Sequence, residues 1–186
     1  MIERGTGGLP MTVGIRDAVV GALVMAGVST LGDFIWAMWI PRHRWYVGLA
    51  HGTLLFLALG LYVGMRVGRA RDGALGGAAV GWLAAGSFYL LAPLAGYSAM
   101  FVVYFTVWIA LAFLVSRLAG PRIAPADTLA RGLLAALGSG AAFYAVAGIW
   151  FPFRPRGWDY AVHFGSWTLA YLPGFLALFA RRSRGA

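Results

Sequence analysis

The sequence predicts an all-α integral membrane protein, a bundle of six transmembrane helices. Hydrophobic residues make up 61% of its 186 residues and the mean hydropathy is +0.77, whereas a soluble domain is about half apolar. Charged residues make up 11%, against about a quarter in soluble domains. The apolar residues fall into six runs, each close to the roughly 20 residues with which a helix crosses a bilayer.

The six apolar runs predict the six helices in order. Lipid offers no hydrogen-bond partner to the backbone, so runs of this length are helical. The predicted spans cover residues 17–40, 46–67, 74–94, 98–118, 128–150 and 160–180. The third run is the least regular, because it is rich in Gly and Ala and has Pro93 near its end.

The connections between the runs contain the residues that interrupt a spanning helix. They are, in order, a Pro/Arg corner at 41–45, an arginine loop at 68–73, a turn at 95–97, a loop at 119–127 and a second Pro/Arg corner at 151–159. We expect residues 1–12 to form a disordered, Gly-rich tail. Residues 13–183 are then a single transmembrane domain.

The arginines predict the orientation in the membrane. All 15 basic residues are Arg, and they lie between the apolar runs, not in the stripe that marks nucleic-acid binding. The larger group, on one side, is Arg4, Arg16, Arg66, Arg69, Arg71, Arg117, Arg122, Arg131, Arg181, Arg182 and Arg184. The positive-inside rule then places both termini in the cytoplasm, with the chain in a bacterial inner membrane.

Two similar corners join the first helix to the second and the fifth to the sixth. Each contains Trp, Pro, two Arg and Trp, and each is followed by a histidine, His51 or His163. A parallel internal repeat of these two helical hairpins would explain the similarity. Chance is the alternative, since Trp is common at membrane interfaces and Gly and Leu match easily.

Asp33 and the two histidines are the strongest candidates for chemistry inside the membrane. At about 1.5 Å per residue, Asp33 lies roughly 10 Å below the outer end of its helix, and His51 lies about 8 Å into the next helix. The two residues therefore lie at similar depths, and an Asp33–His51 pair across this hairpin is geometrically possible. Ionisable groups in the membrane are functional candidates, and a packing role for Asp33 is the alternative.

The outer half of the predicted bundle is also rich in aromatic residues and carries a cationic rim. The rim arginines bind an anionic ligand or reach lipid phosphates; they are Arg42, Arg44, Arg154 and Arg156. Aromatic residues that lie a turn or more inside the interface indicate an outward-opening aromatic cup; they are Trp36, Tyr104, Tyr144 and Trp167.

These observations together predict a ligand-binding site. Its residues are Asp33, Trp36, Arg42, Arg44, His51, Tyr144, Arg154, Arg156, His163 and Trp167. No catalytic or metal-binding residue is predicted, because phosphate-loop, zinc-protease and nucleophile-elbow motifs are missing from the sequence. Cysteine is absent, which excludes disulfides and thiolate metal sites.

Three alanines at four-residue spacing lie on the first predicted helix: Ala18, Ala22 and Ala26. Small residues at this spacing allow another helix to approach closely, either within the chain or from a partner subunit. The chain resembles the substrate-binding membrane subunits of energy-coupling-factor vitamin importers in this alanine spacing, in its size, in its number of helices and in the predicted location of its termini. The resemblance implies an outward pocket and an alanine face that docks a partner subunit.

Three functions are compatible with these residues. The first is binding or transport of an amphipathic or anionic small molecule in the aromatic cup. The second is a redox protein that holds a b-type haem between His51 and His163. The third is a membrane enzyme for lipid or isoprenoid substrates, with Asp33 and His51 as an acid–base pair. A structural role remains the alternative to all three.

Overall fold

The computed structural model describes residues 14–39, 45–119, 124–150 and 159–179. In these residues the chain forms six long helices and one short 3-10 turn: α1 (Ile15–Trp39), α2 (Trp45–Arg66), α3 (Ala70–Ala95), η1 (Gly96–Ser98), α4 (Ala99–Ala119), α5 (Pro125–Trp150) and α6 (Asp159–Phe179). All six helices are long and apolar enough to cross a membrane. The predicted all-α, six-helix fold is confirmed. The predicted tail at 1–12 lies outside the described residues.

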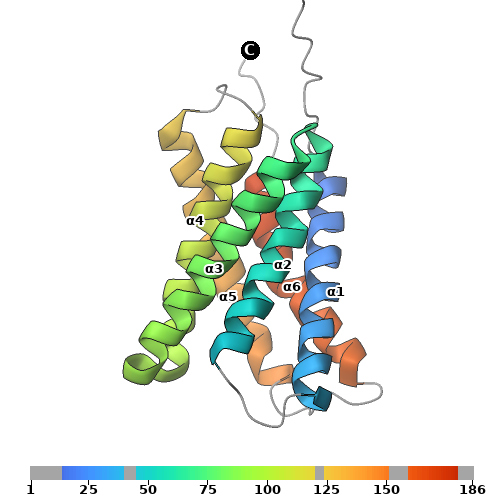
Figure 1. Ribbon diagram of the computed structural model, residues 1–186, viewed down its shortest axis with the longest axis vertical. Helices are drawn as coiled ribbons and strands as arrows, with labels where there is room; N and C mark the ends of the chain where they lie inside the picture. The colour runs from blue at the N-terminus through green and yellow to red at the C-terminus, as the bar shows by residue number, and fades with distance from the viewer. Residues whose placement is uncertain (1–13, 40–44, 120–123, 151–158, 180–186) are drawn as a thin grey trace, which may run out of the picture.

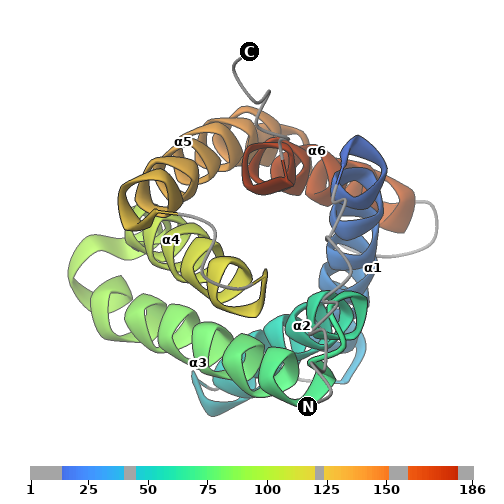
Figure 2. The ribbon, with the colours of Figure 1, turned by 90° about the horizontal axis from the view of Figure 1, so that it is seen from above.

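The helices alternate in direction and follow one another around the bundle. In Figure 1, α1 runs downward and α2 upward, and this alternation continues to α6. Seen from above, the helices are arranged in chain order, so that α6 returns beside α1 (Figure 2). The start of α1, at Ile15, and the end of α6, at Phe179, therefore lie at the same end of the bundle, as an even number of spans requires.

Helices α1, α3 and α5 begin two to four residues earlier than the apolar runs predict, because residues before each run can start a helix. In α1, the Asp17 carboxylate accepts a hydrogen bond from the Gly14 backbone N–H at 3.1 Å, which satisfies one free donor of the first turn. Helix α5 begins with Pro125, whose fixed φ suits the first helical position. Helix α3 follows a tight turn in which the Arg69 N–H donates to the Gly64 carbonyl at 2.7 Å.

The closest packing in the bundle is a glycine seam between α2 and α3. It consists of Gly52, Gly60 and Gly64 on α2 and Gly73, Gly77 and Gly81 on α3. A Cβ atom added to Gly60 would lie 2.1 Å from the Gly73 carbonyl oxygen, and one added to Gly77 would lie 2.1 Å from the Phe56 carbonyl oxygen. Glycine therefore lets the two backbones touch, as small residues do between membrane helices.

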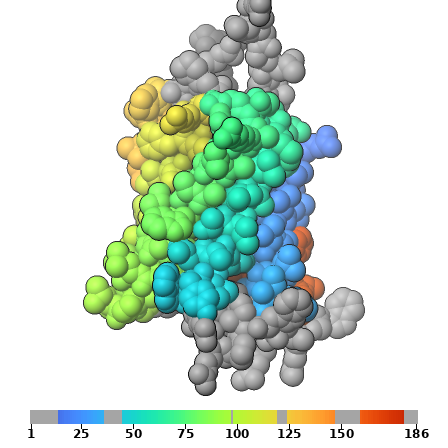
Figure 3. All heavy atoms as spheres, in the orientation of Figure 1, coloured from blue at the N-terminus to red at the C-terminus, as the bar shows by residue number. Residues whose placement is uncertain are grey.

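The outer surface of the bundle is apolar, as a surface that faces lipid must be. Large exposed hydrophobic side chains include Leu54, Leu75, Trp82, Leu83, Leu90, Phe101, Phe113, Leu134, Leu137 and Leu169. Figure 3 shows one such face, on which the cyan surface of α2 and the green surface of α3 adjoin. A water-soluble monomer rarely exposes so much contiguous apolar area, so this surface supports membrane insertion.

The two hairpins of the predicted repeat pack differently. Helix α5 lies along α6, whereas α1 packs along α6 and contacts α2 at few positions. A parallel repeat would give α1–α2 and α5–α6 equivalent packing. The described residues therefore give the repeat no support.

The glycine seam gives a direct stability test. The Gly77→Ala variant places a methyl group against the Phe56 carbonyl and should lower the free energy of unfolding by about 1–3 kcal/mol, as overpacking does. Gly86→Ala, on the same helix α3, meets open space and should be neutral or stabilise by about 0.5–1 kcal/mol. Melting temperatures in one detergent compare the two. Equal melting temperatures would show that α2 and α3 do not touch at this position.

Candidate ligand-binding site

A ladder of polar side chains joins α1 to α6 in the middle of the bundle. Ser29 and Asp33 lie one turn apart on α1, and His163, Trp167 and Tyr171 lie at four-residue spacing on one face of α6. The Ser29 and Tyr171 hydroxyls are 2.9 Å apart. Trp167 Nε1 donates to Asp33 Oδ2 at 2.8 Å, and His163 Nδ1 lies 2.8 Å from the same oxygen. The first and last helices are thus hydrogen-bonded at two levels.

These bonds account for the presence of an acid at this depth in an apolar bundle. His163 is buried, and the Asp33 side chain is 22% exposed. An ionised carboxylate in such surroundings is costly unless donors compensate it, and charge-assisted donors are the stronger ones. Both donors bind Oδ2, and in the described residues Oδ1 accepts no hydrogen bond.

Asp33 also lines a partly open cavity of about 220 Å³ between α1, α2, α3, α4 and α6. Its polar lining groups are Ser29, Asp33, His51, Tyr89 and Tyr171. Its larger apolar and aromatic lining groups are Leu55, Phe56, Phe88, Met100, Tyr104, Trp108 and Trp167. Mostly aromatic walls with a few placed polar groups are typical of small-molecule sites.

The aromatic wall of the cavity is held by ring contacts. The rings of Trp167 and Tyr171 stack with centroids 5.6 Å apart, and Phe143 supports Trp167 from behind at 5.7 Å. Trp108 contacts Phe175 edge-on at 5.3 Å. The Trp108 side chain is buried, yet its Nε1 has no hydrogen-bond partner among the described residues. This N–H is therefore one of the few exceptions to the rule that buried polar groups are hydrogen-bonded.

The cavity lies in the half of the bundle that contains the corners. Its lining residues come from the second half of α1, the first half of α2, the second half of α3 and the first half of α4. In Figure 1 this is the lower half. The cavity therefore lies on the side where the sequence predicts the aromatic cup.

Asp33 pairs with His163, and not across the first hairpin with His51. His51 lines the same cavity, and its ring occupies the space where a Cβ on Gly32 would sit, 1.9 Å from His51 Cε1. In the described residues it makes no hydrogen bond with Asp33. The reason is the helix arrangement: α1 packs along α6 and contacts α2 at few positions, so chain neighbours are not packing neighbours here.

The structure brings together part of the predicted site. Asp33, His51 and Trp167 line the cavity, and His163 contacts Asp33 from α6. Tyr144 stacks on Phe101, with ring centroids 4.3 Å apart, and is not a lining residue. The remaining predicted side chains lie outside the described residues: Trp36, Arg42, Arg44, Arg154 and Arg156.

The sequence prediction missed Ser29, Trp108 and Tyr171. The four-residue spacing of His163, Trp167 and Tyr171 was a usable signal, since it places three polar aromatic groups on one helix face. Ser29 has the same spacing from Asp33. For Trp108 the sequence offers no signal that separates a cavity wall from ordinary core.

The alanine face of α1 is used within the chain. Ala18, Ala22 and Ala26 are fully buried, and a Cβ on the neighbouring Gly21 would lie 3.1 Å from the Phe175 ring of α6. Of the two roles predicted for this face, packing is the one that the structure displays.

Comparison with protein-family models, with curated proteins and with solved structures finds no match for this chain. The geometry of the cavity and of the polar ladder therefore carries the functional argument.

The polar ladder predicts a large effect of removing Asp33. Asp33→Ala removes the acceptor of two donors, one on the buried His163 and one on the partly buried Trp167. We expect a loss of about 2–5 kcal/mol in the free energy of unfolding, since each unsatisfied buried donor costs about 1–3 kcal/mol.

Asp72→Ala is the control for this variant. Asp72 pairs with Arg69 at the surface and its side chain is 55% exposed, so its loss should cost at most about 1 kcal/mol. Thermal melts of both variants in one detergent give the comparison. Equal losses would contradict the role of Asp33 as the link between α1 and α6.

Proposed function

We propose that this protein is an integral membrane protein of the binding or transport class, which takes a small amphipathic molecule into the cavity between α1, α2, α3, α4 and α6. The observation that carries this proposal is the aromatic cavity with Asp33 and His51 in its wall. The polar end of the molecule lies at Asp33 and His51. Its apolar part lies between the aromatic rings.

The cavity volume indicates how large a part of the molecule fits inside the cavity. A dry apolar cavity of about 150 Å³ can hold benzene, and drug-sized ligands occupy about 300–1,000 Å³. At about 220 Å³, the cavity suits a molecule of one ring, or a short alkyl chain, with a small polar group. The small volume of the cavity therefore favours a metabolite-like ligand over a lipid with full-length acyl chains.

The charge of the cavity favours a ligand whose polar end is neutral or cationic. Asp33 is the one acidic or basic side chain, apart from His51, among the described lining residues. Carboxylates repel anions, while aromatic faces attract cations. An anionic ligand would need the corner arginines, which lie outside the described residues.

The two other predicted functions receive less support from this geometry. A haem held by His51 and His163 needs both rings in one cavity, whereas His163 contacts Asp33 and is not a lining residue. A porphyrin is also several times larger than a benzene ring, so a cavity of about 220 Å³ would not enclose it. For an enzyme, the acid–base pair would have to be Asp33–His163 instead of Asp33–His51.

We also propose that the cavity faces the outside of the cell. All arginines of the described residues lie at the end of the bundle opposite to the cavity. They are Arg16, Arg66, Arg69, Arg71, Arg117 and Arg131. The positive-inside rule assigns that end to the cytoplasm.

Single cysteines test this orientation, since the chain has none of its own. Ser98, in the turn η1, and Ala124, before α5, are both exposed. A membrane-impermeant maleimide added to intact cells should label Ser98→Cys and leave Ala124→Cys unlabelled. The reverse pattern would place the cavity on the cytoplasmic side.

A cavity-filling variant tests the binding site. Val103 lines the cavity, while the adjacent Val102 is 45% exposed on the outer face of α4. Val103→Phe should weaken binding by tenfold or more, because a clash of about 1.4 kcal/mol is already a factor of ten. Val102→Phe should bind like the unaltered protein.

Three single-ring probes give the readout: 2-phenylethylamine, 2-phenylethanol and phenylacetate. Tryptophan fluorescence, to which the wall residues Trp108 and Trp167 contribute, reports the binding of each probe. We expect the amine and the alcohol to bind and the carboxylate to bind more weakly, since it meets Asp33. If Val103→Phe and Val102→Phe bind every probe equally, the cavity is not the site.

A further inference from the structure

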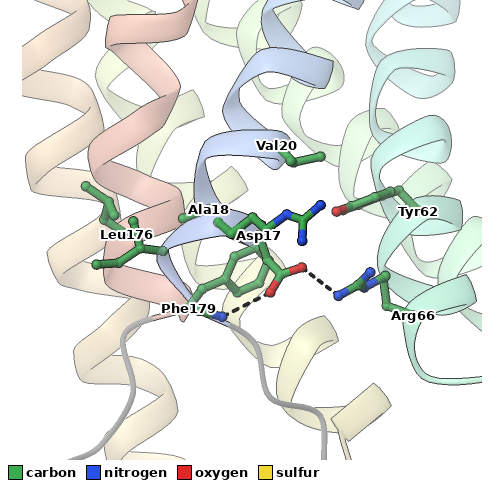
Figure 4. Close-up of a pocket in the computed structure, with 10 residues that line it drawn as sticks. Asp17, Ala18, Val20, Tyr62, Arg66, Leu176 and Phe179 are labelled. Carbon is green, nitrogen blue, oxygen red and sulfur yellow. Dashed lines mark hydrogen bonds and ion pairs between the residues drawn. The ribbon is translucent and has the colours of Figure 1, made fainter.

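A second and larger cavity lies at the arginine-rich end of the bundle. It is an open groove of about 1090 Å³ formed by the start of α1, the end of α2 and the end of α6. Figure 4 shows its walls: Asp17, Ala18 and Val20 come from α1, Tyr62 and Arg66 from α2, and Leu176 and Phe179 from α6. The groove opens where α1 and α2 contact each other at few positions.

One ion pair spans the groove and leaves donors beside it. Asp17 Oδ1 accepts a hydrogen bond from Arg66 Nη2 at 2.7 Å, and its Oδ2 accepts one from the Gly14 N–H at 3.1 Å. The Arg66 side chain is 55% exposed, so further N–H groups of its guanidinium face the open groove. In Figure 4 the Tyr62 hydroxyl and the Arg66 guanidinium both extend from α2 toward α1.

Two lining side chains have donors without a partner. Arg16 is exposed, and in the described residues it makes no hydrogen bond and no ion pair. The Tyr62 hydroxyl likewise has no hydrogen-bond partner in the described part of the chain. Since Asp17 compensates Arg66, Arg16 gives the groove a net positive charge. This arrangement is complementary to an anion with several acceptor oxygens.

The rest of the groove is apolar and lies at the membrane boundary. Val20, Leu176 and Phe179 line it, and α2 ends its span at Arg66. A site of this kind contacts water at its polar end and lipid chains at its apolar wall. Basic pockets between transmembrane helices on the cytoplasmic side bind anionic lipid headgroups.

We infer that this groove binds an anionic phospholipid from the membrane leaflet at the arginine-rich end. The phosphate lies at Arg16, the Tyr62 hydroxyl and the free N–H groups of Arg66. One acyl chain lies along Val20, Leu176 and Phe179. The inference is independent of the proposed function, because the two cavities share no lining residue.

Lipid retention by the purified full chain tests this inference. The protein is incubated in detergent with equal amounts of phosphatidylglycerol and phosphatidylcholine, and the bound lipid is counted by native mass spectrometry. Phosphatidylglycerol should be retained preferentially. Arg16→Gln should lower its retention about five-fold, the factor that corresponds to about 1 kcal/mol for an arginine near an anionic surface.

The matched control is Arg71→Gln. Arg71 is also exposed at the same end and, in the described residues, makes no ion pair, but it does not line the groove. Its variant should retain phosphatidylglycerol like the unaltered protein. Tyr62→Phe removes a hydroxyl without charge and should lower retention by a smaller factor than Arg16→Gln.

Three results would overturn the inference. Equal losses in Arg16→Gln and Arg71→Gln would mean that general surface charge attracts the lipid. Equal retention of both lipids by the unaltered protein would mean that the groove has another occupant, such as a terminal segment of the chain. If 10 mM inorganic phosphate displaced phosphatidylglycerol completely, a phosphate site without a lipid chain would replace the proposal, since an apolar contact contributes to lipid binding alone.

Discussion

The hydrogen bonds of Asp33 are the constraint on which the rest of this bundle depends. An acid in the first helix is compatible with an apolar environment because His163 and Trp167 of the last helix meet one of its oxygens, each at 2.8 Å. These contacts hold α1 against α6 and thereby close the arrangement of helices seen in Figure 2. They also leave the second carboxylate oxygen available to the cavity that Asp33 lines.

A second constraint acts on the opposite side of the bundle, where the glycine seam draws α2 onto α3. Between these two tight contacts, α1 and α2 are consecutive in the chain but touch at few positions. Both cavities lie along this loosely packed boundary, one lined by Asp33 and His51 and the other by Asp17 and Arg66. The two cavities thus lie where the contacts between helices are fewest.

Much of the fold could be predicted from the sequence, because spanning a bilayer demands about 20 apolar residues and the chain contains six such runs. Asp33 and His51 could be found for a similar reason, since ionisable groups stand out in apolar helices. The partner of Asp33 could not be predicted, because the order of the helices in the chain favours a partner on α2, whereas in the folded bundle α6 packs beside α1. The glycine spacing of α3 was visible, but its partner helix was not.

The polar ladder also has a consequence for how the protein is made. Asp33 belongs to α1, and both of its hydrogen-bond donors belong to α6, which is synthesised after the four helices that lie between them in the sequence. The α2–α3 hairpin, with its short connection, can by contrast form as soon as α3 has entered the membrane. Asp33 therefore lacks these two donors until α6 has entered the membrane and packed against α1.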